Sequence, residues 1–220
     1  MYLTTKRLNN KMMGTIVPNI NKNSQVDFKK KNSISYESKR QAFKRASELL
    51  YFNDDLQFFL TLTYRKQHSN YKKVLDDLKN FSRYEKNLKY IGVVEKHKSG
   101  NLHIHLITNK IQLTSYKLDK LSAKNWKLGF SDVVHISTFD KNFNIMKYLF
   151  KYLEKSDKVG GRWVLKSRNL SKPFVYHRKL DINQTYRYLD NLDKSNYHID
   201  KLEIKDYYLR DTILYKFYSQ

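Results

Sequence analysis

The chain has 220 residues and no cysteine, which excludes disulfide bonds and thiolate metal sites and suggests one domain with extensions. It carries 43 Lys and Arg against 21 Asp and Glu, a formal net charge of +22. No apolar run is long enough to cross a bilayer, the N-terminus lacks the apolar core of a signal peptide, and no G-x-x-x-x-G-K-[ST] sequence occurs, so we expect a cytoplasmic protein that is not a P-loop NTPase.

The excess of positive charge is accompanied by 18 Tyr and 12 Phe. A basic surface mixed with aromatic rings favours a polyanion with stackable bases over an acidic small molecule, so nucleic acid is the expected partner and no membrane is expected. An AT-rich genome also raises the content of Lys, Asn, Ile and Tyr, but it does not explain a charge of this size.

The first half of the chain predicts an alternation of helices and strands. Residues 1–33 are rich in Lys and Asn, which predicts a basic arm with a short strand over 14–20, or alternatively a disordered tail. Helical spacing of apolar residues predicts helices over 35–52 and 71–84. The alternation in QFFLTLTY predicts a strand over 57–64, with threonine hydroxyls on one of its faces.

Residues 91–107, IGVVEKHKSGNLHIHLI, predict a β-hairpin with a turn centred on Gly100. The period of two places His103 and His105 on one face of the second strand. Glu95 joins them if the turn has an odd number of residues, and we expect a three-residue loop that pairs it with His105. Two imidazoles and a carboxylate form a ligand set with open positions for water or substrate. Paired histidines on a strand can also be ordinary half-buried residues.

The second half of the chain continues the same alternation. We expect a helix over 114–126, a strand over 130–138 and a helix over 142–156, with a final strand within 199–218. Because strands and helices alternate around a hairpin, the predicted fold class is α+β, with helices packed on a mostly antiparallel sheet.

The helix predicted over 142–156 carries one apolar stripe and a separate patch of Tyr148, Tyr152, Lys151 and Lys155 beside it. A phenol at its ordinary pKa of about 10 is a poor nucleophile, but lysine charge and a metal-polarised phosphodiester would make phenolate attack feasible. The alternative is an ordinary amphipathic helix whose lysines extend to solvent.

FFLTLTY, HIH and YLFKYLEK, in this order, resemble the three motifs of the HUH (His-hydrophobe-His) endonucleases that initiate rolling-circle replication. The tyrosine pair is similar to the two-tyrosine branch of phages, some plasmids and transposons. The resemblance covers roughly residues 57–155, and the basic segment RWVLKSRNLSKP is similar to one that often follows the tyrosine helix. It implies an RRM-like or ferredoxin-like sheet of about five strands in an endonuclease domain over 34–168, between the basic arm and a C-terminal extension, 169–220, packed on the same domain.

The resemblance also implies roles for individual residues. His103, His105 and Glu95 match ligands of Mg²⁺ or Mn²⁺, with His97 as the reserve ligand. The implied nucleophiles are the two tyrosines, with the two lysines at phosphate or metal-assisting positions. Thr61 and Thr63 match the first motif, with a DNA contact. The basic residues after the tyrosine helix are assigned to DNA contact, with a solvated surface as the alternative; these are Arg162, Lys166 and Arg168.

The implied function is nicking and joining of single-stranded DNA through a 5′-phosphotyrosine, which initiates and terminates rolling-circle replication of a phage or plasmid. The implied partners are origin DNA, as a single strand or a hairpin, and a helicase and polymerase from the host or plasmid. Two alternatives stay open. One is a non-catalytic RRM-like protein that binds single strands without metal; the other is an HUH transposase or relaxase with the same chemistry.

Overall fold

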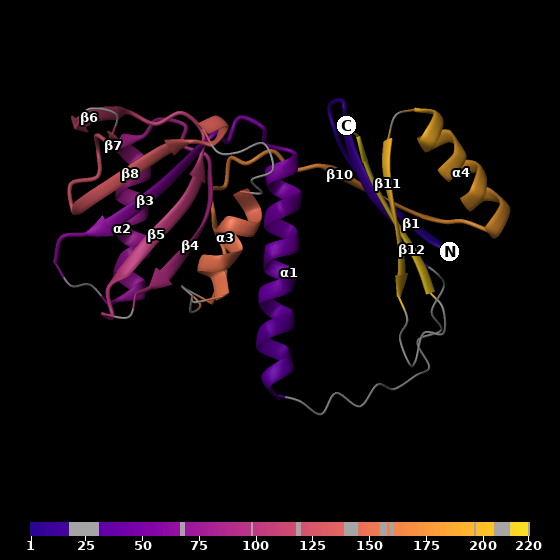
Figure 1. The fold of residues 1–220 in the computed structure, drawn as a ribbon, viewed down its shortest axis with the longest axis horizontal. Helices are drawn as coiled ribbons and strands as arrows, with labels where there is room; N and C mark the ends of the chain where they lie inside the picture. The colour runs from indigo at the N-terminus through magenta and orange to yellow at the C-terminus, as the bar shows by residue number, and fades with distance from the viewer. Residues whose placement is uncertain are drawn as a thin grey trace. The chain divides into compact units, whose positions relative to one another are not determined.

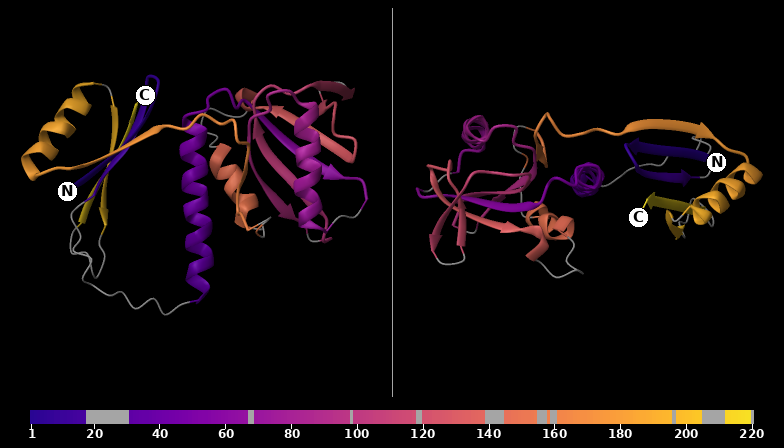
Figure 2. Two further views of the ribbon diagram at one scale, coloured as in Figure 1. Left: turned by 180° about the vertical axis from the view of Figure 1, so that it is seen from behind. Right: turned by 90° about the horizontal axis from the view of Figure 1, so that it is seen from above.

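The computed structural model describes residues 1–17, 31–66, 69–97, 99–117, 120–138, 145–154, 158, 161–195, 197–204 and 212–219. The chain divides into two units (Figures 1 and 2), a central unit, Lys30–Leu170, and a terminal unit that combines Met1–Lys29 with Ser171–Gln220. Each unit has a sheet of its own. The predicted endonuclease domain, 34–168, lies inside the central unit.

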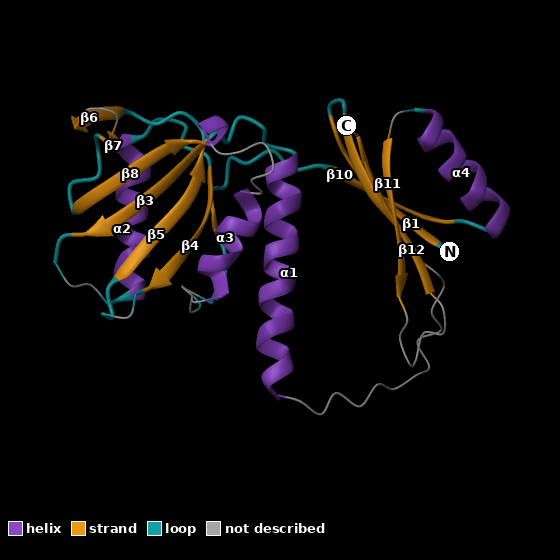
Figure 3. Cartoon of the chain, viewed as in Figure 1, coloured by secondary structure: helices purple, strands orange, loops and turns teal. Residues whose placement is uncertain are grey.

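The central unit is built on a seven-stranded sheet whose paired neighbours are antiparallel, in the order β6-β7-β8-β3-β5-β4-β9 (Figure 3). The α+β class is therefore confirmed, with two strands more than the five expected. The strands are β3 (Phe58–Tyr64), β4 (Tyr90–Lys96), β5 (Leu102–Thr108), β6 (Leu113–Lys117), β7 (Lys120–Ala123), β8 (Gly129–His135) and β9 (Leu165–Lys166). The helices are α1 (Lys31–Tyr51), α2 (Tyr71–Tyr84) and α3 (Ile145–Glu154), with a short 3-10 helix at Ile136–Thr138.

Helix α2 covers one face of this sheet. Asn70 caps its N-terminus, because the Asn70 side chain accepts hydrogen bonds from the backbone N–H groups of Lys72 and Lys73. Its buried stripe packs on the even-numbered residues of β3 and β5, which alternation turns to this side of the sheet. The packed side chains are Leu60, Leu62, Val74, Leu78, Phe81, Ile104 and Leu106.

Helices α1 and α3 pack on the opposite face, and Figure 2 shows α2 and α3 on different sides of the sheet. Leu149 of α3 and Ala46 of α1 are buried in the same cluster as Phe59, Ile91 and Ile107 of the sheet. A sheet with both faces apolar at one end is the reason that β3, β4 and β5 contain so few polar residues.

The helix predicted over 114–126 is wrong, because the segment forms β6 and β7. Leu113 pairs with Ala123, and β7 adds to the edge of β8. Tertiary bonds fix this arrangement: the Ala123 N–H donates to the Ser131 hydroxyl at 2.8 Å, and the Trp126 indole N–H donates to the Thr63 carbonyl at 3.1 Å. Pairing with a sheet edge has overridden the local helical spacing.

The terminal unit joins the two ends of the chain in one five-stranded sheet, in the order β10-β1-β2-β12-β11. Residues 1–17 are therefore a strand hairpin and not the predicted arm, and residues 18–30 lie outside the described residues. The extension predicted to pack on the endonuclease domain belongs instead to this separate unit. Its elements are β1 (Tyr2–Leu8), β2 (Lys11–Val17), β10 (Phe174–Lys179), α4 (Ile182–Lys194), β11 (Tyr197–Ile204) and β12 (Thr212–Ser219).

The core of the terminal unit is small, and contains Leu3, Ile16, Leu180 and Leu192. In both units, the helices that the structure describes include none that is long and apolar enough to cross a membrane.

Candidate functional site

The predicted polar residues of the hairpin lie on the sheet face that α3 partly covers. The strand register pairs His103 with Thr63 on one side and with Glu95 on the other. In the neighbouring row, His105 pairs with Thr61 and Val93. Directly paired residues of antiparallel strands point to the same face, so both histidines, both threonines and the carboxylate share one surface.

The predicted pairing of Glu95 with His105 is wrong, although both side chains share the predicted face. The His97 N–H donates to the Asn101 carbonyl at 2.8 Å, and Gly100 has a φ of +84°, which centres the turn one residue earlier than expected. Moving the centre of a turn by one residue shifts the pairing by two residues, so every side chain keeps its face. Glu95 consequently lies opposite His103 and reaches His105 diagonally.

His105 is held by hydrogen bonds at both ring nitrogens. Its Nε2 lies 3.0 Å from a carboxylate oxygen of Glu95, and its Nδ1 lies 3.2 Å from the Thr61 hydroxyl. An ionised carboxylate only accepts, so Nε2 carries the proton of a neutral ring and the Thr61 hydroxyl donates to Nδ1. Glu95 and His105 are both buried, and this chain of bonds fixes the orientation of the ring.

His103 is more exposed and lies between two other imidazoles. Its ring centroid is 6.4 Å from that of His105 and 5.7 Å from that of His97, which stacks on it. Burial lowers the pKa of His103, and the charge of Glu95 opposes this effect while His97 adds to it. The lowered pKa keeps the ring neutral at neutral pH, which is the form that binds metal ions.

Helix α3 places both predicted tyrosines against His105. The Tyr152 ring stacks on the His105 ring at a centroid distance of 3.8 Å, and the Tyr152 hydroxyl donates to the Tyr148 hydroxyl at 2.7 Å. Phe59 touches both phenol rings from the sheet. The spacing of four residues is what brings the two hydroxyls together, because it places them one helical turn apart on one side of α3.

The surroundings of Tyr152 favour its protonated phenol. Burial raises the pKa of Tyr152, and the hydrogen bond with Tyr148 and the charges of Tyr148 and Glu95 raise it further. The phenol is therefore protonated at neutral pH, which differs from the activated nucleophile expected beside two lysines. Lys151 is exposed to solvent, and Lys155 lies outside the described residues.

The donor set has the right chemistry for a hard divalent cation, with a carboxylate and two neutral imidazoles on one face. The 3.0 Å between Glu95 and His105 equals the separation of about 3.0 Å expected for adjacent octahedral ligands with bonds of about 2.1 Å. His103 does not converge with them as the side chains stand, and the part of the chain that the structure describes contains no group of three His, Asp or Glu arranged to hold a metal ion.

The predicted DNA contacts after the tyrosine helix gather elsewhere. Arg162, Lys166 and Arg168 line a groove of about 820 Å³ together with Lys79 and Arg83 of α2. Leu78 and Leu165, which also line it, belong to the core on the α2 side of the sheet. This basic groove is therefore on the opposite face from the histidines and tyrosines.

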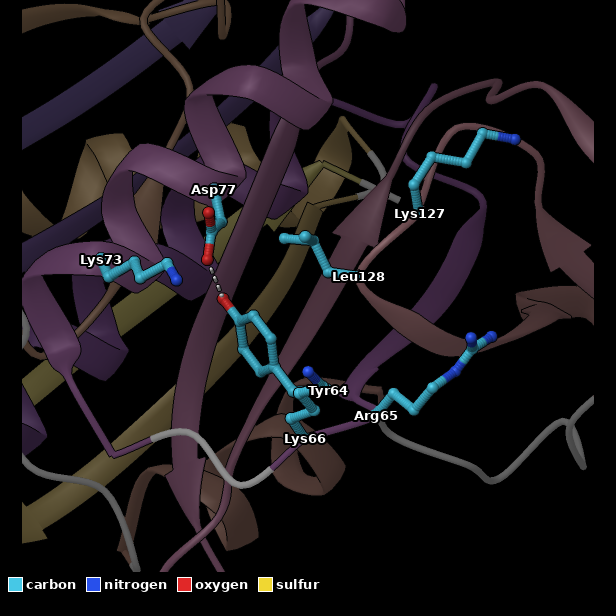
Figure 4. Close-up of a pocket in the computed structure, with 7 residues that line it drawn as sticks. All are labelled: Tyr64, Arg65, Lys66, Lys73, Asp77, Lys127 and Leu128. Atoms are coloured by element: carbon cyan, nitrogen blue, oxygen red, sulfur yellow. Dashed lines mark hydrogen bonds between the residues drawn. The ribbon is translucent and has the colours of Figure 1, made fainter.

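A second basic pocket, of about 430 Å³, was not predicted from the sequence (Figure 4). At its base the buried Tyr64 hydroxyl donates to the Asp77 carboxylate at 3.1 Å, and four cationic side chains surround this pair. They come from the end of β3, the first turn of α2 and the loop before β8, so only the fold brings them together; they are Arg65, Lys66, Lys73 and Lys127.

The Tyr64–Asp77 pair predicts a pH-dependent contribution to stability. Burial, the charge of Asp77 and the hydrogen bond raise the pKa of Tyr64 above its ordinary 10.0. A pKa raised by folding gives stability that is complete below the unfolded pKa and is lost as the pH rises above it. We expect Tyr64→Phe to lower the free energy of unfolding by about 1–3 kcal/mol at neutral pH, and to cost less at about pH 11.

Denaturant unfolding at both pH values measures this difference. Tyr84→Phe is the matched control, because Tyr84 is 68% exposed, and its effect should be near zero at both pH values. A cost of Tyr64→Phe that is constant or grows with pH contradicts the expectation.

Residues 57–157 match the model of a family described as Replication-associated protein ORF2. The matched segment begins one residue before β3 and ends just after α3, so it contains both histidines, the carboxylate and both tyrosines. Comparisons with curated proteins and with solved structures gave no match. The family match supports a replication-associated protein.

Proposed function

We propose that the chain is an HUH endonuclease of the two-tyrosine type, which cuts and rejoins single-stranded DNA in rolling-circle replication of a phage or plasmid. The observation that carries the proposal is the position of two phenol hydroxyls, 2.7 Å apart, on a helix whose Tyr152 ring stacks on His105. A core of apolar residues would satisfy the helix without placing two hydroxyls beside a paired imidazole and carboxylate. The match of residues 57–157 to a replication-associated family supports the same conclusion.

The proposed reaction is a transesterification. A phenol oxygen of Tyr148 or Tyr152 attacks a phosphorus atom of the DNA, and the bond from that phosphorus to the 3′ oxygen breaks. The products are a 5′-phosphotyrosine and a strand with a free 3′-hydroxyl, which takes up the proton that the phenol loses. The number of phosphoester bonds is unchanged, so rejoining needs no ATP, and a polymerase can extend the 3′-hydroxyl.

Glu95, His103 and His105 would hold Mg²⁺ or Mn²⁺ in this site. When bound, the ion would supply charge that polarises a non-bridging phosphate oxygen. The chain's own residues do the positioning: Thr61 and Glu95 fix the His105 ring, and that ring fixes Tyr152 by stacking. Since the pKa of Tyr152 is raised, the phenol loses its proton only as the bond to phosphorus forms.

The second phenol gives the site a reason to contain two tyrosines. While one phenol is linked to the 5′ end of a strand, the other can attack the regenerated origin, and the released 3′-hydroxyl can then attack the first phosphotyrosine to close a circle. Two nucleophiles therefore allow replication to terminate as well as initiate.

The test is a denaturing gel of the protein with circular single-stranded DNA of its own replicon and Mn²⁺, with and without chelator. We expect a protein–DNA adduct that survives denaturant, requires the metal and is lost in His103→Ala. His97→Ala is the matched control, since its ring stacks on His103 from the turn and is more exposed. DNA that is retained without an adduct and without any effect of chelator would leave only a binding protein.

A further inference from the structure

The sheet face that carries the histidines continues beyond α3 to an exposed aromatic side chain on β8. Phe130 is 65% exposed, and it pairs with Thr63, which itself pairs with His103. Phe130 therefore points to the same side of the sheet as the histidines. Two strand spacings separate it from His103, about 10 Å, which is roughly the length of three stacked nucleotides at about 3.4 Å each.

A cation accompanies this ring. The Arg65 guanidinium lies over Phe130 at 5.7 Å from the ring centroid. Arg65 also lines the pocket around the Tyr64–Asp77 pair, with Lys66 and Lys127 (Figure 4). A stackable ring, a guanidinium and a basic pocket thus follow one another from the histidine row around the end of β3.

We propose that this surface binds the single-stranded DNA next to the scissile phosphate, with one base stacked on Phe130 and the adjoining phosphates held by Arg65, Lys66 and Lys127. The inference rests on the proposed function, because it identifies the substrate of the same site as a single strand. In a duplex, bases are stacked on each other and their faces are closed to Phe130, whereas in a single strand every base offers a face.

The charge of the surface supports a strand of nucleic acid over an apolar partner. The pocket holds four cationic side chains against one carboxylate, and that carboxylate already accepts a hydrogen bond from Tyr64. Phosphate groups would complement the remaining charge. An exposed phenylalanine contributes little to the core, but a base stacked on it removes one of its faces from water.

Equilibrium binding to a fluorescent single-stranded oligonucleotide tests the stacking contact. Chelator is present throughout, so that no adduct can form. We expect Phe130→Ala to weaken binding by about tenfold and Phe130→Trp to bind as well as the unchanged protein. Phe174→Ala is the matched control, because Phe174 is 72% exposed on β10 of the terminal unit, and it should bind as the unchanged protein does.

The salt dependence of binding tests the phosphate contacts. Each phosphate contact that is lost should reduce the slope of log affinity against log salt by about 0.7 for a single strand. Lys66→Ala and Lys127→Ala should each show this reduction, and the exposed Lys86→Ala should not. Equal slopes for all three variants would overturn the assignment of the phosphate path.

The binding assay and the adduct assay separate the two proposals. Weaker binding of Phe130→Ala in a protein that never forms an adduct supports the stacking surface and refutes the nicking activity. Normal binding of Phe130→Ala in a protein that does form the adduct overturns the stacking surface alone. Failure of the unchanged protein to bind single-stranded DNA overturns both.

Discussion

A protein carrying both Tyr148→Phe and Tyr152→Phe is expected to lose covalent adduct formation with single-stranded DNA by more than about a thousandfold, while each single variant still forms the adduct. The two hydroxyls are 2.7 Å apart, so either phenol can reach nearly the same phosphate. Phenylalanine keeps the rings that pack on Phe59 and His105, so the double variant should fold normally.

Denaturing gels with labelled DNA and Mn²⁺ measure the adduct, and circular dichroism checks the fold. Tyr186→Phe is the control, because Tyr186 is 61% exposed on α4 and should not become linked to DNA. The single variant with the slower first cut identifies the phenol that acts first. An adduct in the double variant would refute both tyrosines as nucleophiles, and complete loss in either single variant would refute their equivalence.

Glu95→Gln is expected to weaken Mn²⁺ binding by more than about a hundredfold and to abolish metal-dependent adduct formation, without a large loss of stability. The amide oxygen of glutamine can still accept the hydrogen bond from Nε2 of His105, which the carboxylate accepts at 3.0 Å. The substitution does, however, remove the negative charge of the carboxylate that lies beside the histidine pair.

Electron paramagnetic resonance of free Mn²⁺ measures this affinity without reference to activity. The matched control is Asp132→Asn, an exposed acid that pairs with Thr61 on the same sheet face, and it should leave the affinity unchanged. Equal Mn²⁺ affinity in Glu95→Gln and the unchanged protein would exclude Glu95 as a ligand. It would leave the carboxylate with the single role of orienting His105.

Local patterns in the sequence were sufficient for the parts of the site that each lie within one element. The period of two placed His103 and His105 on one face of β5, and the spacing of four placed Tyr148 and Tyr152 on one side of α3. The position of Glu95 depended on the turn. Its face was predicted correctly because it depends only on whether the turn length is odd, whereas its partner depends on where the turn is centred.

Features that depend on contacts between distant segments could not be predicted in this way. Nothing in the residues around Thr114 indicates that β8 offers a free edge, so the helical spacing there was misleading. The lysine-rich start of the chain resembled an arm because its partner strand β10 begins only at Phe174. The aromatic Phe130 and the pocket around Tyr64 likewise became visible as one surface only in the folded sheet.

The joining of both chain ends in one sheet affects the order in which the protein folds during synthesis. Strand β1 pairs with β10, and the Met1 amino group donates to the Leu180 carbonyl, 179 residues away. The central unit is continuous in sequence, so it can fold as soon as residue 170 has left the ribosome. The N-terminal hairpin must wait for its partner strands until the end of translation, and the folded central unit then shortens the loop that has to close.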